Sequence, residues 1–196
     1  MGSLPAYSGL RHLGADLMAR FGRDDWLRLG LAALADGGEP GLRLEAITGR
    51  AGKTRGSFYH HFETHDDFIA ALVSAWKTQN TDALIAEAEG EDTAVASARK
   101  LNALAAGLDH RLDRAVRRLS ARHPAAAEAV ATVDAARIAY LRQLQADPAS
   151  EASADYALIE YAVFVGIQTI LPDSQPARLE ALGRLTTDMI AVHWNE

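Results

Sequence analysis

The stretch LRLEAITGRAGKTRGSFYHHF, residues 42–62, decides how the rest of this sequence is interpreted. Its apolar residues recur at helical spacing and predict one helix over residues 44–51 and a second over 55–61. Gly52 lies between them and can adopt the left-handed conformation that a tight turn requires. The two helices would share a small core made of Leu44, Ile47, Ala51, Phe58 and Phe62. This pattern predicts a helix-turn-helix.

The second predicted helix would present polar side chains to the outside. Arg55 has two donors that could bond a guanine edge, and Ser57 could bond several base edges. Gly56 has no side chain, so the helix could approach DNA closely. Helix-turn-helix proteins place the first part of this helix in the major groove. The candidate DNA-binding residues are Arg43, Lys53, Thr54, Arg55, Gly56, Ser57, Tyr59, His60, His61 and His65. The alternative is that these residues only solvate an ordinary helical hairpin.

The remainder of the chain also has the pattern of helices. Alanine and leucine dominate, and glycine and proline occur at wide intervals. Thr64 and Asp67 predict a capping box at the start of a long helix that reaches residue 89. Further helices are predicted near residues 10–21, 24–36, 93–106, 109–122, 124–145, 150–171 and 176–193. The predicted class is all-α, with an N-terminal extension (1–23), a helix-turn-helix domain (24–66) and a helical body (67–196).

Composition and charge narrow the possible functions. The formal net charge is −6, but residues 42–62 carry four basic side chains against one acidic side chain. There is no cysteine, which excludes disulfides and thiolate metal sites. The most apolar stretch, 156–171, contains Glu160 and Gln168 and is too short to span a bilayer. The N-terminus has no signal-peptide pattern, so we expect a cytoplasmic protein without a membrane partner.

Residues 42–62 resemble the DNA-binding domain of the tetracycline-repressor (TetR) family of transcriptional regulators. The resemblance rests on Leu44, Ile47, Ala51-Gly52 and the run at 54–62, and it continues at Phe68, Ala71, Leu72 and Trp76. In the body, the residues similar to one subgroup are Val133-Asp134, Arg137, Tyr140-Leu141 and Gly166 to Gln168. The resemblance implies a three-helix head and a body that encloses a ligand pocket. It also implies that the last two helices form a four-helix dimer interface.

Some positions depart from the family pattern. Arg43 stands where many members have a threonine that caps the helix and touches phosphate. Lys53 replaces an apolar turn residue, and Thr48 replaces a small alanine that packs closely. His65 stands where a lysine commonly reaches phosphate, so we expect this contact to weaken as the pH rises above the histidine pKa of ~6.5.

Several body residues have more than one interpretation. If the pocket exists, Trp76, Tyr140 and Tyr161 could line it, although each could equally be plain core. Glu160 lies either at the edge of the dimer interface or beside an arginine. A basic stripe is either a second nucleic-acid surface or a solvated face with pairs such as Asp113 with Arg117. The stripe consists of Arg111, Arg114, Arg117, Arg118 and Arg122.

The expected function is sequence-specific transcriptional regulation by a homodimer that binds a pseudo-palindromic operator in double-stranded DNA. We expect a repressor that a small-molecule effector releases from DNA. The sequence offers no catalytic constellation, so we expect no enzymatic activity and no cofactor. His61 and His65 are four residues apart, but without further ligands they do not predict a metal site. The alternative function is a helical small-molecule-binding protein that acts through protein contacts without binding DNA.

Overall fold

The computed structural model describes residues 21–172 and 175–194, with side chains up to residue 190. The predicted helix near residues 10–21 lies outside these residues except for Phe21. The all-α prediction is confirmed, because the described residues form helices and contain no strand. The α-helices are α1 (Arg23–Gly37), α2 (Leu44–Ala51), α3 (Arg55–Tyr59), α4 (His65–Lys77), α5 (Ala83–Ala88), α6 (Ala94–Ala106), α7 (His110–Leu119), α8 (Pro124–Gln143), α9 (Glu151–Ile170) and α10 (Pro176–Trp194).

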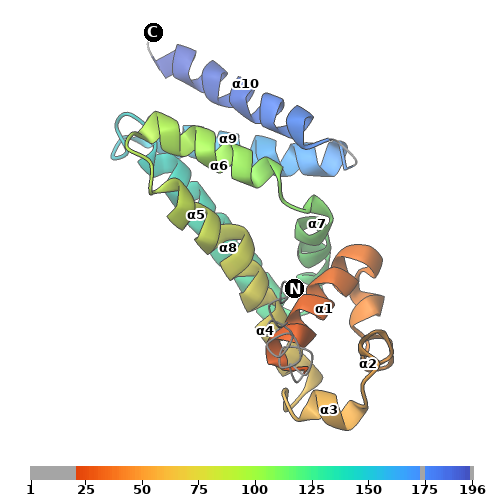
Figure 1. The fold of residues 1–196 in the computed structure, drawn as a ribbon. Coiled ribbons are helices and arrows are strands. Elements are labelled where there is room, and N and C mark those ends of the chain that lie inside the picture. The colour runs from red at the N-terminus through yellow and green to blue at the C-terminus, as the bar shows by residue number, and fades with distance from the viewer. Residues whose placement is uncertain (1–20, 173–174, 195–196) are drawn as a thin grey trace, which may run out of the picture.

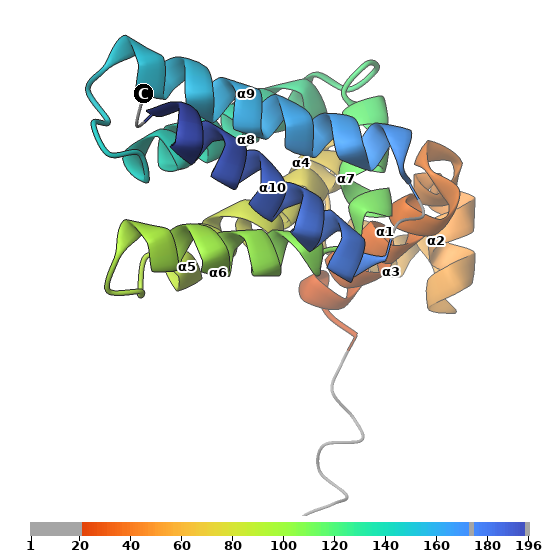
Figure 2. The ribbon, with the colours of Figure 1, turned by 90° about the horizontal axis from the view of Figure 1, so that it is seen from above.

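Three short helices form a head at one end of the molecule, and α6 to α10 form a body at the other (Figure 1). Helix α4 leaves the head and continues through α5 into the body. Helix α10 lies across α6 and α9, as the view from above shows (Figure 2). None of the described helices is both long and apolar enough to cross a membrane.

An aromatic cluster holds the head together. The Phe58 ring lies 5.4 Å from Trp26, 5.2 Å from Phe62 and 5.2 Å from Phe68, measured between ring centroids. Trp26, Phe58 and Phe68 are fully buried, and Phe62 is nearly so. These rings come from α1, α3, the segment after α3, and α4. The cluster therefore fixes the short α3, which could not persist in water without tertiary contacts.

The long helix between head and body begins as predicted. The Thr64 hydroxyl accepts a hydrogen bond from the amide of Asp67 at 3.0 Å, and the Asp67 carboxylate accepts one from the amide of Thr64 at 2.9 Å. The helix is not regular, however, because Thr78–Asp82 forms a π-helical turn between α4 and α5. Arg137 of α8 donates to the carbonyl oxygen of Asn80 at 3.0 Å within this turn. A carbonyl in a widened turn is open to such a partner, and the sequence pattern gives no sign of it.

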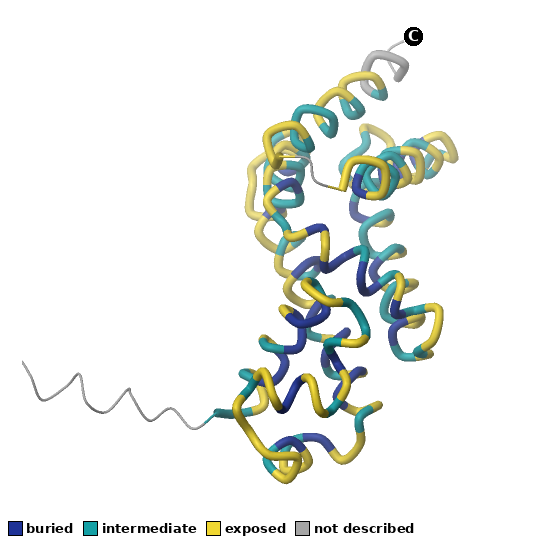
Figure 3. The backbone as a smooth tube through the Cα atoms, turned by 90° about the vertical axis from the view of Figure 1, so that its right-hand side faces the viewer, coloured by how far each residue is buried: buried dark blue, intermediate teal, exposed yellow. Residues whose placement is uncertain are grey.

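The burial of the chain differs between the two ends. Buried backbone gathers in the head and around α4 and α7, whereas α10 is intermediate or exposed along its described length (Figure 3). Helix α7 packs against α1 of the head and α8 of the body. It therefore connects the well-buried head to the body.

The predicted pairing of Asp113 with Arg117 on α7 is wrong. Arg117 instead binds Asp134 of α8 at 2.6 Å, and Asp113 binds Arg137 of α8 at 3.0 Å. Asp113 is buried and points toward the core, so a solvated pair one turn along the helix does not form. Arg111 of α7 also pairs, with Asp109 at 2.8 Å, whereas Arg118 is exposed and bonds only the Arg114 carbonyl among the described residues.

Candidate nucleic-acid interface and ligand cavity

The turn between α2 and α3 places the outward residues. Gly52 has φ of 60° and ψ of 32°. This left-handed conformation is energetically unfavourable for residues that have a side chain. The Lys53 amide then donates to the Thr48 carbonyl at 3.0 Å, which closes the end of α2. Thr54 caps α3, because its hydroxyl accepts a hydrogen bond from the Ser57 amide at 3.2 Å. Helix α3 therefore starts at a fixed position relative to α2.

One face of α3 is buried and the other is open to solvent. Phe58 points into the aromatic cluster, while Tyr59 keeps 49% of its surface exposed. Arg55, Gly56 and His60 are also exposed. A Cβ on Gly56 would meet only the Thr54 hydroxyl, at 3.8 Å, so this face of the helix has no bulk near its start. The exposed face of α3 therefore carries hydrogen-bond donors and an aromatic ring, and its backbone is uncovered at Gly56.

Two of the predicted DNA-binding cations have partners within the head. Arg55 pairs with Glu45 of α2. The Lys53 ammonium lies 5.4 Å from the centroid of the Phe21 ring. Both cations remain exposed, so their partners hold them only weakly.

His65 differs from these cations. It is half-buried, and its Nε2 lies 2.8 Å from the carbonyl oxygen of Leu42. A carbonyl oxygen only accepts, so Nε2 must donate, and Nδ1 can donate to a phosphate only when the ring is protonated. His65 thus ties the start of α4 to the residues that precede α2. Within the described residues, no group of three or more histidine, aspartate or glutamate side chains is placed to hold a metal ion, and this includes the surroundings of His61 and His65.

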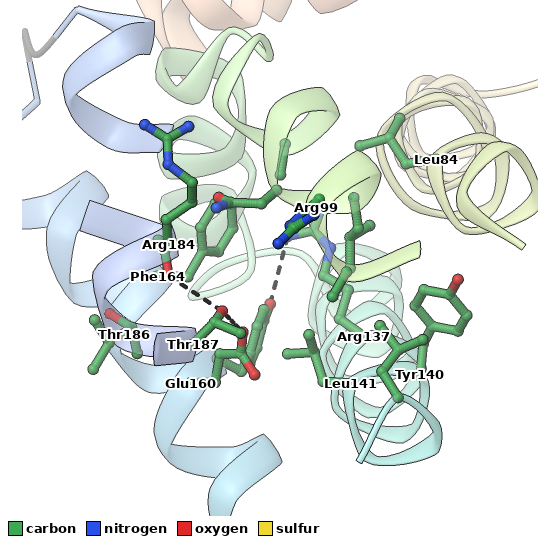
Figure 4. A pocket seen from close by; sticks show the side chains of 18 of the residues that line it. Leu84, Arg99, Arg137, Tyr140, Leu141, Glu160, Phe164, Arg184, Thr186 and Thr187 are labelled. Carbon is green, nitrogen blue, oxygen red and sulfur yellow. Dashed lines mark hydrogen bonds between the residues drawn. The ribbon is translucent and has the colours of Figure 1, made fainter. Parts of the chain in front are cut away.

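A cavity of about 800 Å³ opens in the body among α5, α6, α8, α9 and α10. Tyr140 and Leu141 of α8 lie on one side, opposite Thr186 and Thr187 of α10 (Figure 4). Most of the wall is aliphatic or aromatic. This volume and lining are typical of sites for drug-sized molecules.

Polar and charged side chains also line the cavity, among them Arg99, Arg137 and Arg184. Glu160 of α9 accepts a hydrogen bond from the Thr187 hydroxyl at 2.8 Å, and the two side chains point toward each other (Figure 4). Burial raises the pKa of Glu160, and the hydrogen bond from Thr187 offsets only part of this effect. His110 and Gln168 also line the cavity and are 8% and 3% exposed.

A buried ionic network lies beside the cavity and joins three helices. We use this name for Asp113, Asp134, Arg117, Arg137 and Tyr161. The Asp113 carboxylate accepts from the Trp76 indole at 2.9 Å and from Arg137 at 3.0 Å. The Asp134 carboxylate accepts from Arg117 and from the Tyr161 hydroxyl, both at 2.6 Å.

The network shifts the pKa values of its members. Burial raises the pKa of Tyr161 to about 12. Burial also acts to raise the pKa of Asp134, but the hydrogen bonds from Arg117 and Tyr161 outweigh it and lower the pKa. Asp134 therefore remains charged at neutral pH, and the hydrogen bonds of the network fix α7, α8 and α9 relative to one another.

No family model matches this chain, and no curated protein matches its sequence significantly. Solved structures do match it. A transcriptional regulator from Rhodococcus sp. Rha1 is 21% identical, with a TM-score of 0.74 over 86% of this chain and 95% of that one. A protein from Rhodococcus sp. assigned to the TetR family of transcriptional regulators is 18% identical, with a TM-score of 0.65 over 86% and 97%. Another protein with that assignment, from Mesorhizobium loti MAFF303099, is 17% identical, with a TM-score of 0.64 over 87% and 95%.

The chain has the fold of TetR-family transcriptional regulators. In this TetR fold, the predicted DNA-binding residues gather in the turn, along α3 and at the start of α2 and α4. Arg43 is the residue before α2 and is exposed, and its side chain makes no capping hydrogen bond, as the sequence predicted. Thr48 is buried, and its hydroxyl donates to the Leu44 carbonyl at 2.6 Å within α2. The Thr48 hydroxyl therefore has its hydrogen-bond partner within its own helix.

The pocket predictions for this TetR fold are partly correct. Tyr140 and Tyr161 line the cavity. Trp76 does not, because it is fully buried against Asp113. Glu160 accepts a hydrogen bond from Thr187 and pairs with no arginine among the described residues, so its place at the edge of a dimer interface stays a prediction.

Sequence reasoning missed two features of the site. His110 drew no attention, because a histidine after a capping aspartate is ordinary at the start of a helix. The pairing of Asp113 with Arg137 was also missed, since the two residues are 24 positions apart and lie on different helices. A signal was nevertheless present, because Asp113 interrupts the apolar face of α7 made by Leu112, Val116 and Leu119.

Proposed function

We propose that this protein is a dimeric transcriptional regulator that binds a pseudo-palindromic operator through α3. We further propose that it acts as a repressor and that a small molecule in the body cavity lowers its affinity for DNA. The observation that carries the proposal is the two-sided α3, with Phe58 anchored in the core and Arg55, Tyr59 and His60 directed outward. Side chains of these types recognise base edges and phosphates.

The charge of the head supports this assignment. Arg43, Arg50, Lys53 and Arg55 are all exposed, although the whole chain has a formal net charge of −6. The pair between Arg55 and Glu45 is open to water, with 63% and 69% of the side chains exposed. Exposed ion pairs are weak, so DNA could displace the Glu45 carboxylate at little cost.

The apolar surface of the last two helices supports a dimer. Leu158 and Ile159 of α9 are 53% and 51% exposed, and Leu185 and Met189 of α10 are 54% and 65% exposed. Large apolar side chains clustered on the surface of one chain favour burial against a second. A two-fold dimer would place the two copies of α3 about one turn of DNA apart, roughly 34–36 Å.

Helix α7 supports a link between cavity and head. Its first residue, His110, lines the cavity. Beyond its other end, Arg122 and His123 bind the Glu39 carboxylate of the head at 3.2 and 3.3 Å. A ligand that moves α7 would shift the head relative to the body, and this changes DNA affinity if ligand and DNA favour different positions.

The decisive experiment is enrichment of random DNA fragments by the purified protein at moderate salt, followed by sequencing. We expect a pseudo-palindrome with half-sites about one helical turn apart. Enrichment of no sequence by folded protein would count against the proposal. Salt dependence separates it from a role in protein contacts only, because six to ten phosphate contacts lower affinity by ~10³–10⁵ between ~50 and ~200 mM salt.

The role of Arg55 is tested on the recovered operator. Arg55→Ala is expected to weaken specific binding by roughly 1–3 kcal/mol and to relax the preference at one base pair. Arg178→Ala is the matched control, because Arg178 is an exposed arginine on α10, at the opposite end of the molecule from α3 (Figure 1). Equal operator affinity of the two variants would remove Arg55 from base recognition.

A further inference from the structure

Three buried polar side chains that line the cavity have no hydrogen-bond partner in good geometry: His110, Gln168 and Tyr140. Neither ring nitrogen of His110 nor the Nε2 of Gln168 makes such a bond within the described residues, although the Ala106 carbonyl lies close to the His110 ring. All three side chains are more than nine-tenths buried. More than nine in ten buried polar groups in proteins have a partner. Unpartnered groups in one cavity therefore point to a ligand that supplies the missing hydrogen bonds.

His110 and Gln168 belong to the same end of the cavity. The His110 ring contacts the Phe164 ring edge-on, with centroids 5.8 Å apart. Arg114 lies one turn after His110 on α7, and Gln168 lies one turn after Phe164 on α9. Arg114 donates to the backbone carbonyl of Gln168 at 3.2 Å. Helices α7 and α9 therefore run alongside each other, and His110 and Gln168 lie within one helical turn of the same contact.

Charges of both signs lie near this end of the cavity, because Asp113 and Asp109 as well as Arg114 act electrostatically on His110. Arg114 is half-buried, and no carboxylate lies within ion-pair distance of it among the described residues. By contrast, Arg111, Arg117 and Arg122 all have carboxylate partners. A half-buried cation without a counter-charge favours an anion nearby.

The hydrogen-bonding capacity of the two side chains also suits an acceptor. Burial lowers the pKa of His110, so its ring is neutral at neutral pH and offers one N–H donor. Gln168 offers the hydrogens of Nε2. A carboxylate has two neighbouring oxygens that each accept hydrogen bonds, and its negative charge would balance the positive charge of Arg114.

We propose that the cavity binds an apolar monocarboxylate whose two oxygens accept hydrogen bonds from His110 and Gln168. This inference rests on the proposed ligand-responsive function and names the chemical class of the ligand. The apolar body of the ligand would lie along the aliphatic wall formed by residues such as Leu101, Val163 and Ile167. The cavity of about 800 Å³ has room for a long alkyl or aryl acid.

The opposite polar site in the cavity defines the competing possibility. Glu160 lies two helical turns before Gln168 on α9, about 12 Å along the helix axis. Within the described residues it has no lysine or arginine partner, and its hydrogen bond comes from Thr187. An amine ligand would place its charge here and leave His110 and Gln168 unpartnered.

The test uses three probes with one carbon skeleton: dodecanoate, 1-dodecanol and dodecylamine. Each is titrated into the full chain by calorimetry, below its micelle concentration and without DNA. We expect dodecanoate to bind about tenfold more tightly than 1-dodecanol, as two hydrogen bonds to a charged group imply. Gln168→Met keeps the length of the side chain and is expected to remove most of this preference, with little effect on 1-dodecanol.

Thr169→Ala is the matched control for α9, because Thr169 is exposed and adjacent to Gln168 but does not line the cavity. It is expected to bind dodecanoate as the unmodified chain does. Circular dichroism verifies the fold of each variant. If Gln168→Met fails to fold, Gln168→Glu replaces it and should repel dodecanoate while still accepting 1-dodecanol.

Several results would overturn the proposal. Equal affinities for dodecanoate and 1-dodecanol, or an unchanged preference in Gln168→Met, would remove the carboxylate site. A preference for dodecylamine that Glu160→Gln abolishes would assign the ligand's charge to the opposite site. Failure of both dodecanoate and 2-naphthoate to bind would exclude the ligand class. Because DNA is absent, a chain that enriches an operator but binds no carboxylate keeps the proposed function and loses only this inference.

Discussion

The head and the body of this protein are stabilised in different ways. In the head, aromatic and aliphatic side chains fill the interior, and the polar residues with a proposed function lie outside it. In the body, α9 and α10 have few fully buried side chains, and the helices enclose a cavity of about 800 Å³. Charged residues of the buried ionic network lie in the interior of the body, whereas the interior of the head contains apolar side chains.

This difference follows from what each end must do. The head needs one fixed shape to present α3, and close packing of apolar side chains gives a single rigid arrangement. A ligand site needs space and unpartnered polar groups, which both reduce stability. The buried ionic network lies where the two requirements meet, around α7. The predictions below test whether the head depends on apolar packing and the body on polar contacts.

The largest effect is expected from Phe58→Ala in the head. Removing this fully buried ring takes away contacts with Trp26, Phe62 and Phe68 and leaves a cavity, so unfolding should become easier by about 3–5 kcal/mol. Urea unfolding followed by circular dichroism, at one protein concentration, measures the loss. Tyr59→Ala, one residue away and 49% exposed, is the control and should change stability by less than about 1 kcal/mol. A loss below that value for Phe58→Ala would contradict the packed head.

A slightly smaller loss is expected from Asp113→Asn in the body. The substitution leaves the buried Arg137 guanidinium without its counter-charge and weakens the acceptor for the Trp76 indole. Breaking one partner of a buried pair costs about 3 kcal/mol. Asp36→Asn removes exposed pairs with Arg50 of the head and Arg111 of α7 and should cost under about 1 kcal/mol. Similar losses in the two variants would mean that the buried ionic network contributes nothing beyond a surface pair.

The same contrast explains what the sequence could predict. In the head, each helix has an apolar face at regular spacing, and Gly52 and the Thr64 cap end or begin helices by local rules. These features depend on neighbours a few positions away, so the helix limits of α2 and the start of α4 agree with the prediction. The outward position of Arg55 followed from the inward position of Phe58.

The body shows where local rules are insufficient. The pairing of Asp113 with Arg137 requires knowledge of which helices are neighbours, and spacing within one helix pointed to Arg117 instead. The π-helical turn depends on Arg137 reaching Asn80 from another helix. The cavity is a property of packing between helices, so the sequence left lining or core open for three residues, of which Tyr140 and Tyr161 line the cavity and Trp76 is core.

A moderate effect is expected where α10 crosses α6. A Cβ on Gly183 would lie 2.2 Å from the Oδ1 of Asn102, whose Nδ2 donates to the Glu180 carbonyl at 3.2 Å. Gly183→Ala should therefore lower stability by about 1–3 kcal/mol, as overpacking does. Gly49→Ala is the comparison in the head, since a Cβ there meets nothing within 4 Å inside α2. It should raise stability by roughly 0.5–1 kcal/mol, and a gain in both variants would show that α10 does not approach α6 closely.

The smallest effect is expected from Glu160→Gln and depends on pH. Burial raises the pKa of Glu160 in the folded chain above its ordinary value of 4.5, so the folded state holds this proton more tightly than the unfolded state. The contribution of Glu160 to stability is therefore fully present below that value and is lost as the pH rises through the folded pKa. The glutamine side chain has no proton to lose, so Glu160→Gln avoids this loss of stability. Across this pH window the free energy of unfolding of Glu160→Gln should therefore rise relative to that of the unmodified chain. At higher pH the difference between the two should be constant. Urea unfolding at a series of pH values measures this, with Thr187→Val as the opposite case. That variant removes the hydroxyl that donates to the carboxylate, so its stability should fall more steeply with pH. Parallel curves for all three chains would mean that Glu160 is as well solvated as an exposed carboxylate of the head, and that the polar interior of the body ends at the buried ionic network.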